Sequence, residues 1–288
     1  RTRRRYQHRH RRRMNKAQLE QALAACGVRP GQHFGQHFML DENLLDFIVR
    51  TAAPQPGETI LEIGPGLGAL TRRLLEAGAQ VIAVELDKRL VEYLHREFAG
   101  TGLTLVQGDA CRIDLAALLS GHTSCRCLAN LPYAITSPFL ERILELPEPP
   151  AELLLLLQLE TAQRLAAAKN TREYGSLSVS VQTAYEVSVV RRVPPEVFHP
   201  RPQVHSALVR FRRRSELPAP STRRHLRLVA RVAFSERRKM MRKALSRRFG
   251  DDPTRTAMAT LGIIPEARAQ TLSPKQFLAL SAQLPDPV

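Results

Sequence analysis

Short apolar runs alternate with amphipathic stretches through the first two thirds of the chain. Runs that are apolar at nearly every position are typical of strands buried on both faces of a parallel sheet. The stretches between them, such as 90–98 and 161–168, carry apolar residues at helical spacing. Strands that alternate with helices predict an α/β fold with a doubly wound, Rossmann-like sheet. The predicted strands are 59–63, 81–85, 103–109, 126–129 and 153–157.

The segments that flank this alternation predict further elements. Residues 15–26 have helical spacing, and Asp41 is placed to cap a second helix. Between them, a doubled Gly-Gln-His-Phe at 31–38 is predicted to fold over a ligand pocket. Later in the chain, 187–193 and 204–211 predict an antiparallel pair of strands at the sheet edge, whereas 176–185 fits a strand or a helix.

After about Glu216 the pattern changes, because a segment rich in proline and serine leads into helices alone. We therefore expect a basic disordered tail at 1–13, a sheet domain at 14–214 and a small helical domain at 215–288. Met14 directly follows the tail, which is either upstream translated sequence or a native extension. The predicted helices of the last domain are 222–234, 237–249, 252–261 and 274–284.

The formal net charge of +16 is unevenly distributed. Eight arginines in the first thirteen residues supply half of it, and 210–248 holds fifteen Lys or Arg against two acids. Such a run is either a solvated face or a surface for a polyanion, and its clustering favours nucleic acid. The candidates for RNA contact are Arg223, Arg227, Arg237, Arg238, Lys239, Arg242 and Lys243.

Other features of the composition narrow the class of protein. The sequence has no apolar run near the ~20 residues that a membrane-spanning helix needs, and no signal-peptide pattern. Its four cysteines form no disulfide framework, and Cys125-x-Cys127 lacks a second ligand pair for a metal. We expect a cytoplasmic, monomeric protein without a metal site.

The strand at 59–63 runs into a glycine turn, Gly64-Pro-Gly66-Leu-Gly68, that opens the next helix. The following strand ends at Glu85, and an acid about 20 residues after such a turn binds ribose hydroxyls in nucleotide-type folds. The full G-x-G-x-x-G spacing and the Walker lysine are both missing. Since Glu62 before the turn suits an ammonium group better than a pyrophosphate, S-adenosylmethionine is the better fit.

Polar residues recur where the predicted strands end. Glu62, Glu85, Asp109 and Asn130 all lie at or near carboxyl ends, where parallel sheets bind ligands. Asp109 is followed by a small Ala110, and it either holds an adenine amine or caps the strand end.

The tetrapeptide Asn130-Leu131-Pro132-Tyr133 can activate an exocyclic amine on a nucleobase. Such an amine is a poor nucleophile because its lone pair is delocalised into the ring. The Asn130 side-chain oxygen and a rigid carbonyl from Leu131 or Pro132 can accept its two hydrogens, while Tyr133 stacks on the base. A plain turn after a buried strand is the alternative interpretation.

Several motifs together resemble the ribosomal RNA adenine dimethyltransferase family over about residues 28–283. The most similar branch dimethylates two adjacent adenines in the 3'-terminal hairpin of small-subunit rRNA, which links such a protein to small-subunit biogenesis. The motifs are Gln36-His37-Phe38, Glu62-Ile63-Gly64-Pro65-Gly66, Val84-Glu85-Leu86-Asp87, Gly108-Asp109-Ala110, Asn130-Leu131-Pro132-Tyr133, Tyr174-Gly175-Ser176-Leu177-Ser178, the 198–207 segment and Arg237-Arg238-Lys239.

The resemblance implies a role for each motif. His37 and Met39 would line the methionine end of the cofactor, beside a turn formed by Glu62, Gly64 and Gly66. Glu85 would take the ribose, with Asp109 and Ala110 at the adenine. Asn130 would contact cofactor and target, and Phe198 would stack on the target base opposite Tyr133. The implied partner is small-subunit rRNA in a pre-30S particle.

The chain departs from the family pattern at four positions. His37 stands where asparagine is usual, Met39 where leucine is usual, Leu159 where lysine is common and Gln270 where glutamate is usual. Leu159 puts one RNA contact in doubt, and Gln270 puts a local helix pairing in doubt.

Three other functions remain open at this point. A large-subunit rRNA adenine methylase of the antibiotic-resistance type shares the sheet and the Asn-x-Pro-Tyr. A non-catalytic assembly or RNA-binding factor and a DNA adenine methylase are the others. Intact Glu85, Asp109 and Asn130 argue against loss of catalysis.

Overall fold

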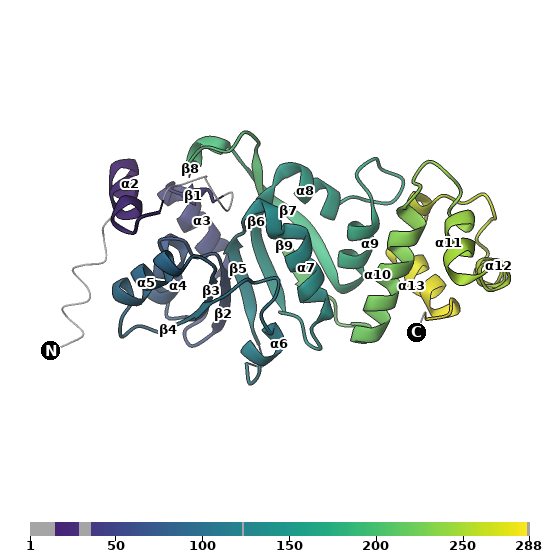
Figure 1. Ribbon diagram of the computed structural model, residues 1–288, viewed down its shortest axis with the longest axis horizontal. Helices are drawn as coiled ribbons and strands as arrows, with labels where there is room; N and C mark the ends of the chain where they lie inside the picture. Colours follow the sequence, from purple (N-terminus) through teal and green to yellow (C-terminus); the bar gives the residue numbers. More distant parts are fainter. Residues whose placement is uncertain (1–14, 29–35, 123, 287–288) are drawn as a thin grey trace.

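The computed structural model describes residues 15–28, 36–122 and 124–286 (Figure 1). The tail at 1–13 and most of the doubled Gly-Gln-His-Phe segment lie outside these residues, so the predictions made for them are not tested. None of the described helices combines the length and the hydropathy needed to cross a bilayer.

A seven-stranded sheet forms the centre of the described chain, in the order β4-β3-β2-β5-β6-β9-β7. The five strands from β4 to β6 are parallel, and β9 and β7 run antiparallel at one edge. The predicted doubly wound sheet is therefore confirmed, as is the antiparallel edge pair. The strands are β2 Thr59–Ile63, β3 Gln80–Glu85, β4 Leu103–Gln107, β5 Arg126–Asn130, β6 Glu152–Gln158, β7 Tyr185–Val193 and β9 Ser206–Arg213.

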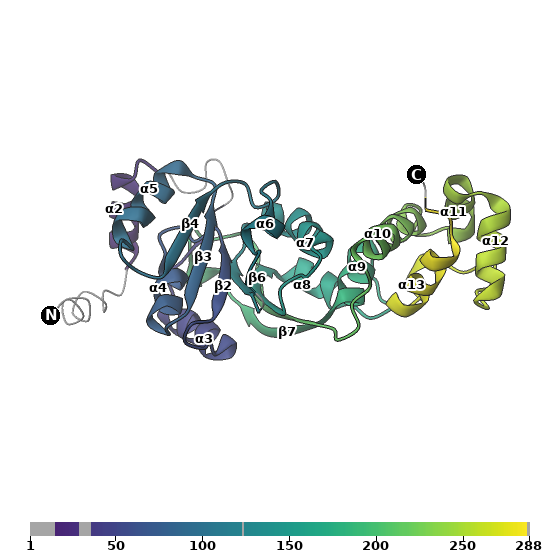
Figure 2. The same ribbon diagram turned by 90° about the horizontal axis from the view of Figure 1, so that it is seen from below.

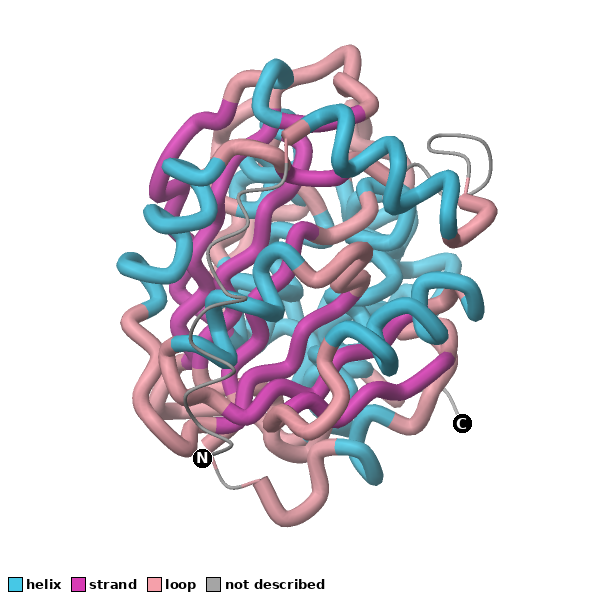
Figure 3. The backbone as a smooth tube through the Cα atoms, turned by 90° about the vertical axis from the view of Figure 1, so that its left-hand side faces the viewer, coloured by secondary structure: helices cyan, strands magenta, loops and turns pink. Residues whose placement is uncertain are grey.

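Helices lie on both sides of the sheet (Figure 3). One face packs on α3 Glu42–Ala52 and α4 Ala69–Glu76, whose apolar stripes include Leu45 and Leu74. The opposite face packs on α7 Thr136–Glu145 through Phe139, with α8 Leu159–Leu165 and α9 Ser176–Ala184 beside it. The remaining helices of this part are α2 Lys16–Ala25, α5 Lys88–Glu97 and the short α6 Leu115–Leu118.

A second part of the molecule is entirely helical and lies at the end opposite α2 (Figure 2). It comprises α10 Pro220–Phe234, α11 Met241–Phe249, α12 Asp251–Thr260 and α13 Pro274–Gln283. Its apolar core also takes in Tyr174 and Val179, so α9 supports both parts. The boundary near residue 214 stays a prediction.

The helix predicted at 237–249 begins later than expected, at Met241. Residues 235–239 instead form turns. The Arg237 guanidinium donates to the carbonyl oxygens of Tyr174 and Thr171, at 2.5 and 2.9 Å. These long-range bonds hold the turn in place, and a local pattern cannot reveal them.

Candidate functional site

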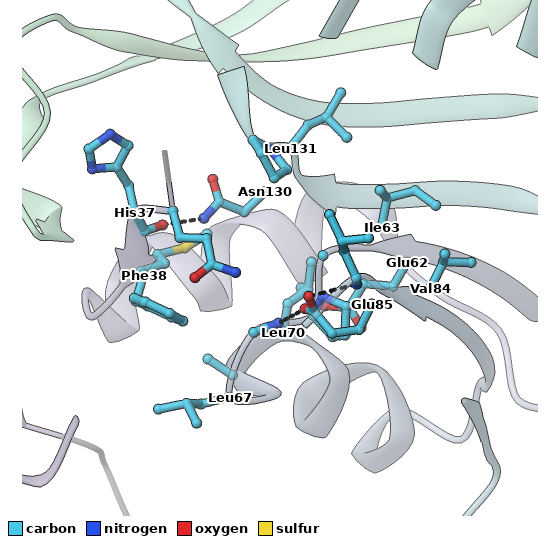
Figure 4. Close-up of a pocket in the computed structure, with 18 of the residues that line it drawn as sticks. His37, Phe38, Glu62, Ile63, Leu67, Leu70, Val84, Glu85, Asn130 and Leu131 are labelled. Carbon is cyan, nitrogen blue, oxygen red and sulfur yellow. Dashed lines mark hydrogen bonds between the residues drawn. The ribbon is translucent and has the colours of Figure 1, made fainter. Parts of the chain in front are cut away.

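A cavity of about 140 Å³ lies at the carboxyl ends of β2, β3, β4 and β5 (Figure 4). Glu62, Glu85, Asp109 and Asn130 all line it, as predicted from their places at the strand ends. Residues 36–40 and Leu19 of α2 also line the cavity, and Leu19 had no predicted role in ligand binding. Part of the segment expected to fold over a pocket therefore does so.

The glycine turn lets the chain pass close to its neighbours. Gly66 and Gly68 both have positive φ, at 61° and 78°, which glycine adopts without strain. A Cβ on Gly66 would come within 3.0 Å of the Phe38 ring, and one on Gly68 within 2.4 Å of the Phe98 ring. The turn thus needs glycine for both its conformation and its packing.

Glu85 is held by the backbone around it. Its carboxylate accepts hydrogen bonds from the amides of Gly66, Leu86 and Asp87, at 3.2, 2.8 and 3.0 Å. Burial raises the pKa of Glu85, and these three amides counter that effect. The side chain is consequently fixed with its oxygens at the cavity wall.

Glu62 is a buried acid of the cavity with a strongly raised pKa. It is 2% exposed, and burial raises its pKa to about 8, against a hydrogen bond of 2.6 Å from the Thr71 hydroxyl. The nearby Glu85 raises the pKa further by like-charge repulsion. None of the described residues that line the cavity is lysine or arginine. An acid-lined cavity without a side-chain cation suits a positively charged ligand and disfavours a phosphate.

Asp109 combines the two interpretations that its sequence position left open. One oxygen accepts from the Cys111 amide at 2.8 Å, which is the capping interaction, and the other lies 3.4 Å from Nε of Arg112. The residue also lines the cavity together with the buried Ala110. A cap within the chain and contact with a ligand are therefore compatible.

The Asn130 side chain is oriented by the segment across the cavity. Its Nδ2 donates to the backbone oxygen of His37 at 2.8 Å (Figure 4). Because a carbonyl can only accept, this bond fixes which end of the amide is nitrogen and leaves Oδ1 as an acceptor. Leu131 and Pro132, which follow, also line the cavity.

Tyr133 also lines the cavity. It begins a short 3-10 turn, η1 Tyr133–Ile135, and its hydroxyl lies 2.6 Å from Oγ of Ser206. Its ring centroid is 5.3 Å from that of His37, with the planes tilted by 35°. Ser206, the first residue of β9, is a supporting residue that lies in the 198–207 motif but had no predicted role.

Phe198 does not lie where the resemblance implied. It belongs to β8 Phe198–His199, which pairs antiparallel with β1 Phe38–Met39. The side chain is 3% exposed, packs in the apolar core and does not line the cavity. Met39, its pairing partner, does line the cavity. The Phe198 ring is therefore part of the apolar core next to Met39 and does not face the cavity as a stacking surface.

Two of the arginines proposed for RNA contact are structural instead. Arg223 is 5% exposed and donates to the carbonyls of Leu144, Leu146 and Pro218. Arg227 is half-buried and pairs with Glu145 at 2.5 Å. Both tie α10 to α7, because a guanidinium can satisfy several acceptors at once.

The other proposed basic residues differ in how free they are. Arg237 holds the turn before α11, and Lys239 pairs with Glu236. Arg242 is half-buried, while Arg238 and Lys243 are exposed. Two exposed arginines nearby, Arg224 and Arg248, were not among the candidates. All these residues lie in one charged stretch of the sequence, so only the tertiary packing shows which of them are engaged inside the protein and which are exposed.

The chain is similar to known proteins over most of its length. Residues 29–286 match the family described as ribosomal RNA adenine dimethylase. The chain is 42% identical over 264 residues to the ribosomal RNA small subunit methyltransferase A of Phenylobacterium zucineum, covering 91% of each chain.

Two solved structures extend the comparison. A dimethyladenosine transferase from Plasmodium falciparum has a TM-score of 0.71 at 23% identity, covering 85% of this chain and 96% of that one. At this identity the likeness concerns the fold alone. The 23S rRNA methyltransferase ErmE has a TM-score of 0.62 at 28% identity, covering 86% and 99%.

Proposed function

The chain belongs to the ribosomal RNA adenine dimethylase family, and on that premise we propose its reaction, its cofactor and its substrate. The protein is an S-adenosylmethionine-dependent rRNA methyltransferase that dimethylates the N6 amine of two adjacent adenines in the 3'-terminal hairpin of small-subunit rRNA. Its similarity to a small-subunit relative exceeds its similarity to a large-subunit methyltransferase, which favours this substrate over the antibiotic-resistance type.

One observation carries the choice of cofactor: the cavity holds two buried acidic side chains, Glu62 and Glu85, and no lining lysine or arginine among the described residues. S-adenosylmethionine carries an ammonium group, a ribose and an electrophilic sulfonium methyl, and it has no phosphate. Glu62 would face the ammonium group and Glu85 the ribose hydroxyls. Asp109 and Ala110 would lie at the adenine, and Met39 at the methionine end.

The target amine would be activated by acceptors that the chain already positions. His37 O holds the amide nitrogen of Asn130, so Oδ1 can accept from the amine at no cost of reorientation. Pro132 O is engaged by the Ile135 amide at 3.1 Å, which favours Leu131 O as the second acceptor. Both bonds localise the lone pair on nitrogen, which makes it nucleophilic. The proton leaves after methylation, when the amine has become acidic.

Tyr133 would form the wall against which the target base stacks. Its hydroxyl is tied to Ser206 and its ring to His37, so the ring has little freedom to turn away. A fixed aromatic wall lowers the entropy lost when an unpaired base enters. No second aromatic wall is assigned, since Phe198 is buried in the apolar core and does not line the cavity.

The partner would be small-subunit rRNA within a pre-30S particle, met in the cytoplasm by a monomer. Exposed basic residues of the helical part, Arg224, Arg238, Lys243 and Arg248, are the best placed to contact phosphates. This set replaces the candidates Arg223 and Arg227, whose guanidinium groups are engaged inside the protein.

The test is methyl transfer to small-subunit rRNA or assembly particles by the purified chain, with modified adenines mapped by sequencing. We expect dimethyladenine in the terminal hairpin with the wild type. Asn130→Ala should lose at least about a hundredfold in rate while its S-adenosylmethionine affinity stays within about tenfold. Methylation confined to large-subunit rRNA, or normal turnover by the variant, would refute the proposal. Binding without any methylation would indicate an assembly factor.

A further inference from the structure

His37 connects three segments that are far apart in the sequence. Its backbone oxygen accepts from Asn130, its ring lies 5.3 Å from that of Tyr133, and its Nδ1 is 2.7 Å from the oxygen of Pro200. A carbonyl cannot donate, so Nδ1 carries the proton of this bond. Figure 4 shows the ring turned away from Glu62 and Glu85, with only the carbonyl oxygen directed at Asn130.

The bond to Pro200 continues a very short sheet. β1 and β8 pair through only two positions, Phe38 with His199 and Met39 with Phe198. Beyond them the chain enters the loop 200–205, and the His37 side chain provides the next link. The His37 side chain therefore supplies a hydrogen bond next to the last pair of residues that the two strands join through their backbones.

The loop 200–205 is anchored at both ends to residues that line the cavity. At its start Pro200 is bonded to His37, and directly after its end Ser206 is bonded to Tyr133. Between these anchors the loop exposes Arg201 and Val204. A base that stacks on Tyr133 would therefore lie close to this loop.

We infer that His37 is a positioning residue for the target base: its imidazole N–H fixes the 200–205 loop beside Tyr133, and its side chain contributes little to cofactor binding. The inference rests on the proposed function for the identity of the target. It assigns the side chain to the RNA side of the cavity, whereas the backbone oxygen of the same residue serves Asn130.

Three substitutions separate the parts of the His37 side chain. Asparagine places an amide nitrogen the same number of bonds from the backbone as Nδ1, so His37→Asn can still donate to Pro200 O. His37→Phe keeps a ring beside Tyr133 and removes the donor, and His37→Ala removes both. All three keep the backbone oxygen that holds Asn130.

Two measurements on the full chain test the inference. Hydrogen exchange of 198–206 reports the loop without requiring activity. It should be faster by about tenfold in His37→Phe and His37→Ala, and near the wild-type rate in His37→Asn. Steady-state kinetics should show the KM for RNA raised about tenfold in the Phe and Ala variants and restored in the Asn variant. The affinity for S-adenosylmethionine should stay within about twofold in all three.

The inference is overturned if cofactor affinity falls as much as RNA affinity, or if the Phe variant matches the wild type in both measurements. A wild-type chain that methylates no small-subunit adenine would refute the proposed function instead. The exchange rates of the three variants would then still decide whether His37 holds the loop.

Discussion

Glu62 illustrates how one buried side chain can link ligand binding to pH. It has no cationic partner among the described residues, and the Thr71 hydroxyl only partly offsets the loss of hydration. Burial accordingly raises the pKa of Glu62 to about 8, so near neutral pH the group is mostly protonated in the free protein. An ammonium group brought beside it favours the carboxylate and lowers that pKa.

Cofactor affinity should therefore rise with pH below about pH 7.5. Binding lowers the Glu62 pKa and releases a proton, so raising the pH strengthens binding, by at most about tenfold per unit. The prediction stops at about pH 7.5 because the α-amino group of the ligand itself begins to lose its charge above that pH: a free α-amino group has a pKa of about 7.7–8.0. Calorimetric titration with S-adenosylmethionine at about pH 6 and about pH 7.5 measures the effect.

Glu62→Gln is the matched control, because it keeps the shape and the bond to Thr71 but cannot ionise. The affinity of the Glu62→Gln variant for S-adenosylmethionine should be lower than that of the wild type and should change less with pH. Equal pH dependence in the two proteins would assign the titration to another group.

At the scale of elements, a buried arginine, Arg223, lies at the junction of α7 and α10. The last turn of α7 leaves carbonyl groups without helical partners, and Arg223 donates to those of Leu144 and Leu146. Its third bond, to Pro218 O, fixes the approach to α10. A residue that looked like part of an RNA surface is therefore a cap and a crosslink between two helices.

Arg223→Met should destabilise the protein by about 3 kcal/mol, because two buried carbonyls and one partly buried carbonyl lose a charged donor while the side-chain bulk is largely kept. Arg224→Met, on the next residue of the same helix but exposed, should change the free energy of unfolding by less than about 0.5 kcal/mol. Urea unfolding monitored by circular dichroism compares the two. Equal losses of unfolding free energy in the two variants would show that the buried bonds of Arg223 do not stabilise the protein.

Elements also differed in how clearly the sequence predicted them. The strands β2, β3 and β6 were predicted well because most of their positions are apolar, as burial on both faces requires. Helix α9 remained ambiguous because six of its nine residues are buried, between the sheet and the helical part, which removes the amphipathic pattern. Helix α7 was not predicted.

At the scale of the whole molecule, positive charge gathers on the helical end. Figure 1 places α10, α11 and α12 opposite the end formed by α2, α3 and α5. Arg224, Arg238, Lys243 and Arg248 are exposed on the helical part. A polyanion that reaches these residues would release counterions, which makes its affinity sensitive to salt.

Replacing these four residues by glutamine should weaken RNA binding and flatten its dependence on salt. Each lost phosphate contact reduces the slope of log K against log salt by about 0.7–0.9. Filter binding at several salt concentrations measures the slope. The control replaces Arg50, Lys88 and Arg96, which are exposed at the opposite end. A slope that changes only in the control would move the RNA surface to that end.

The sequence by itself determined the sheet, the glycine turn and the acids at the strand ends. These follow from local periodicity, from glycine's access to positive φ, and from the rule that parallel strands end at one edge. Only the tertiary structure decided which charged and aromatic side chains are free. Arg223 and His37 bond to carbonyl groups 79 and 163 residues away in the sequence. Phe198 is buried because it packs in the apolar core. Contacts between such distant segments leave no periodic trace in the sequence.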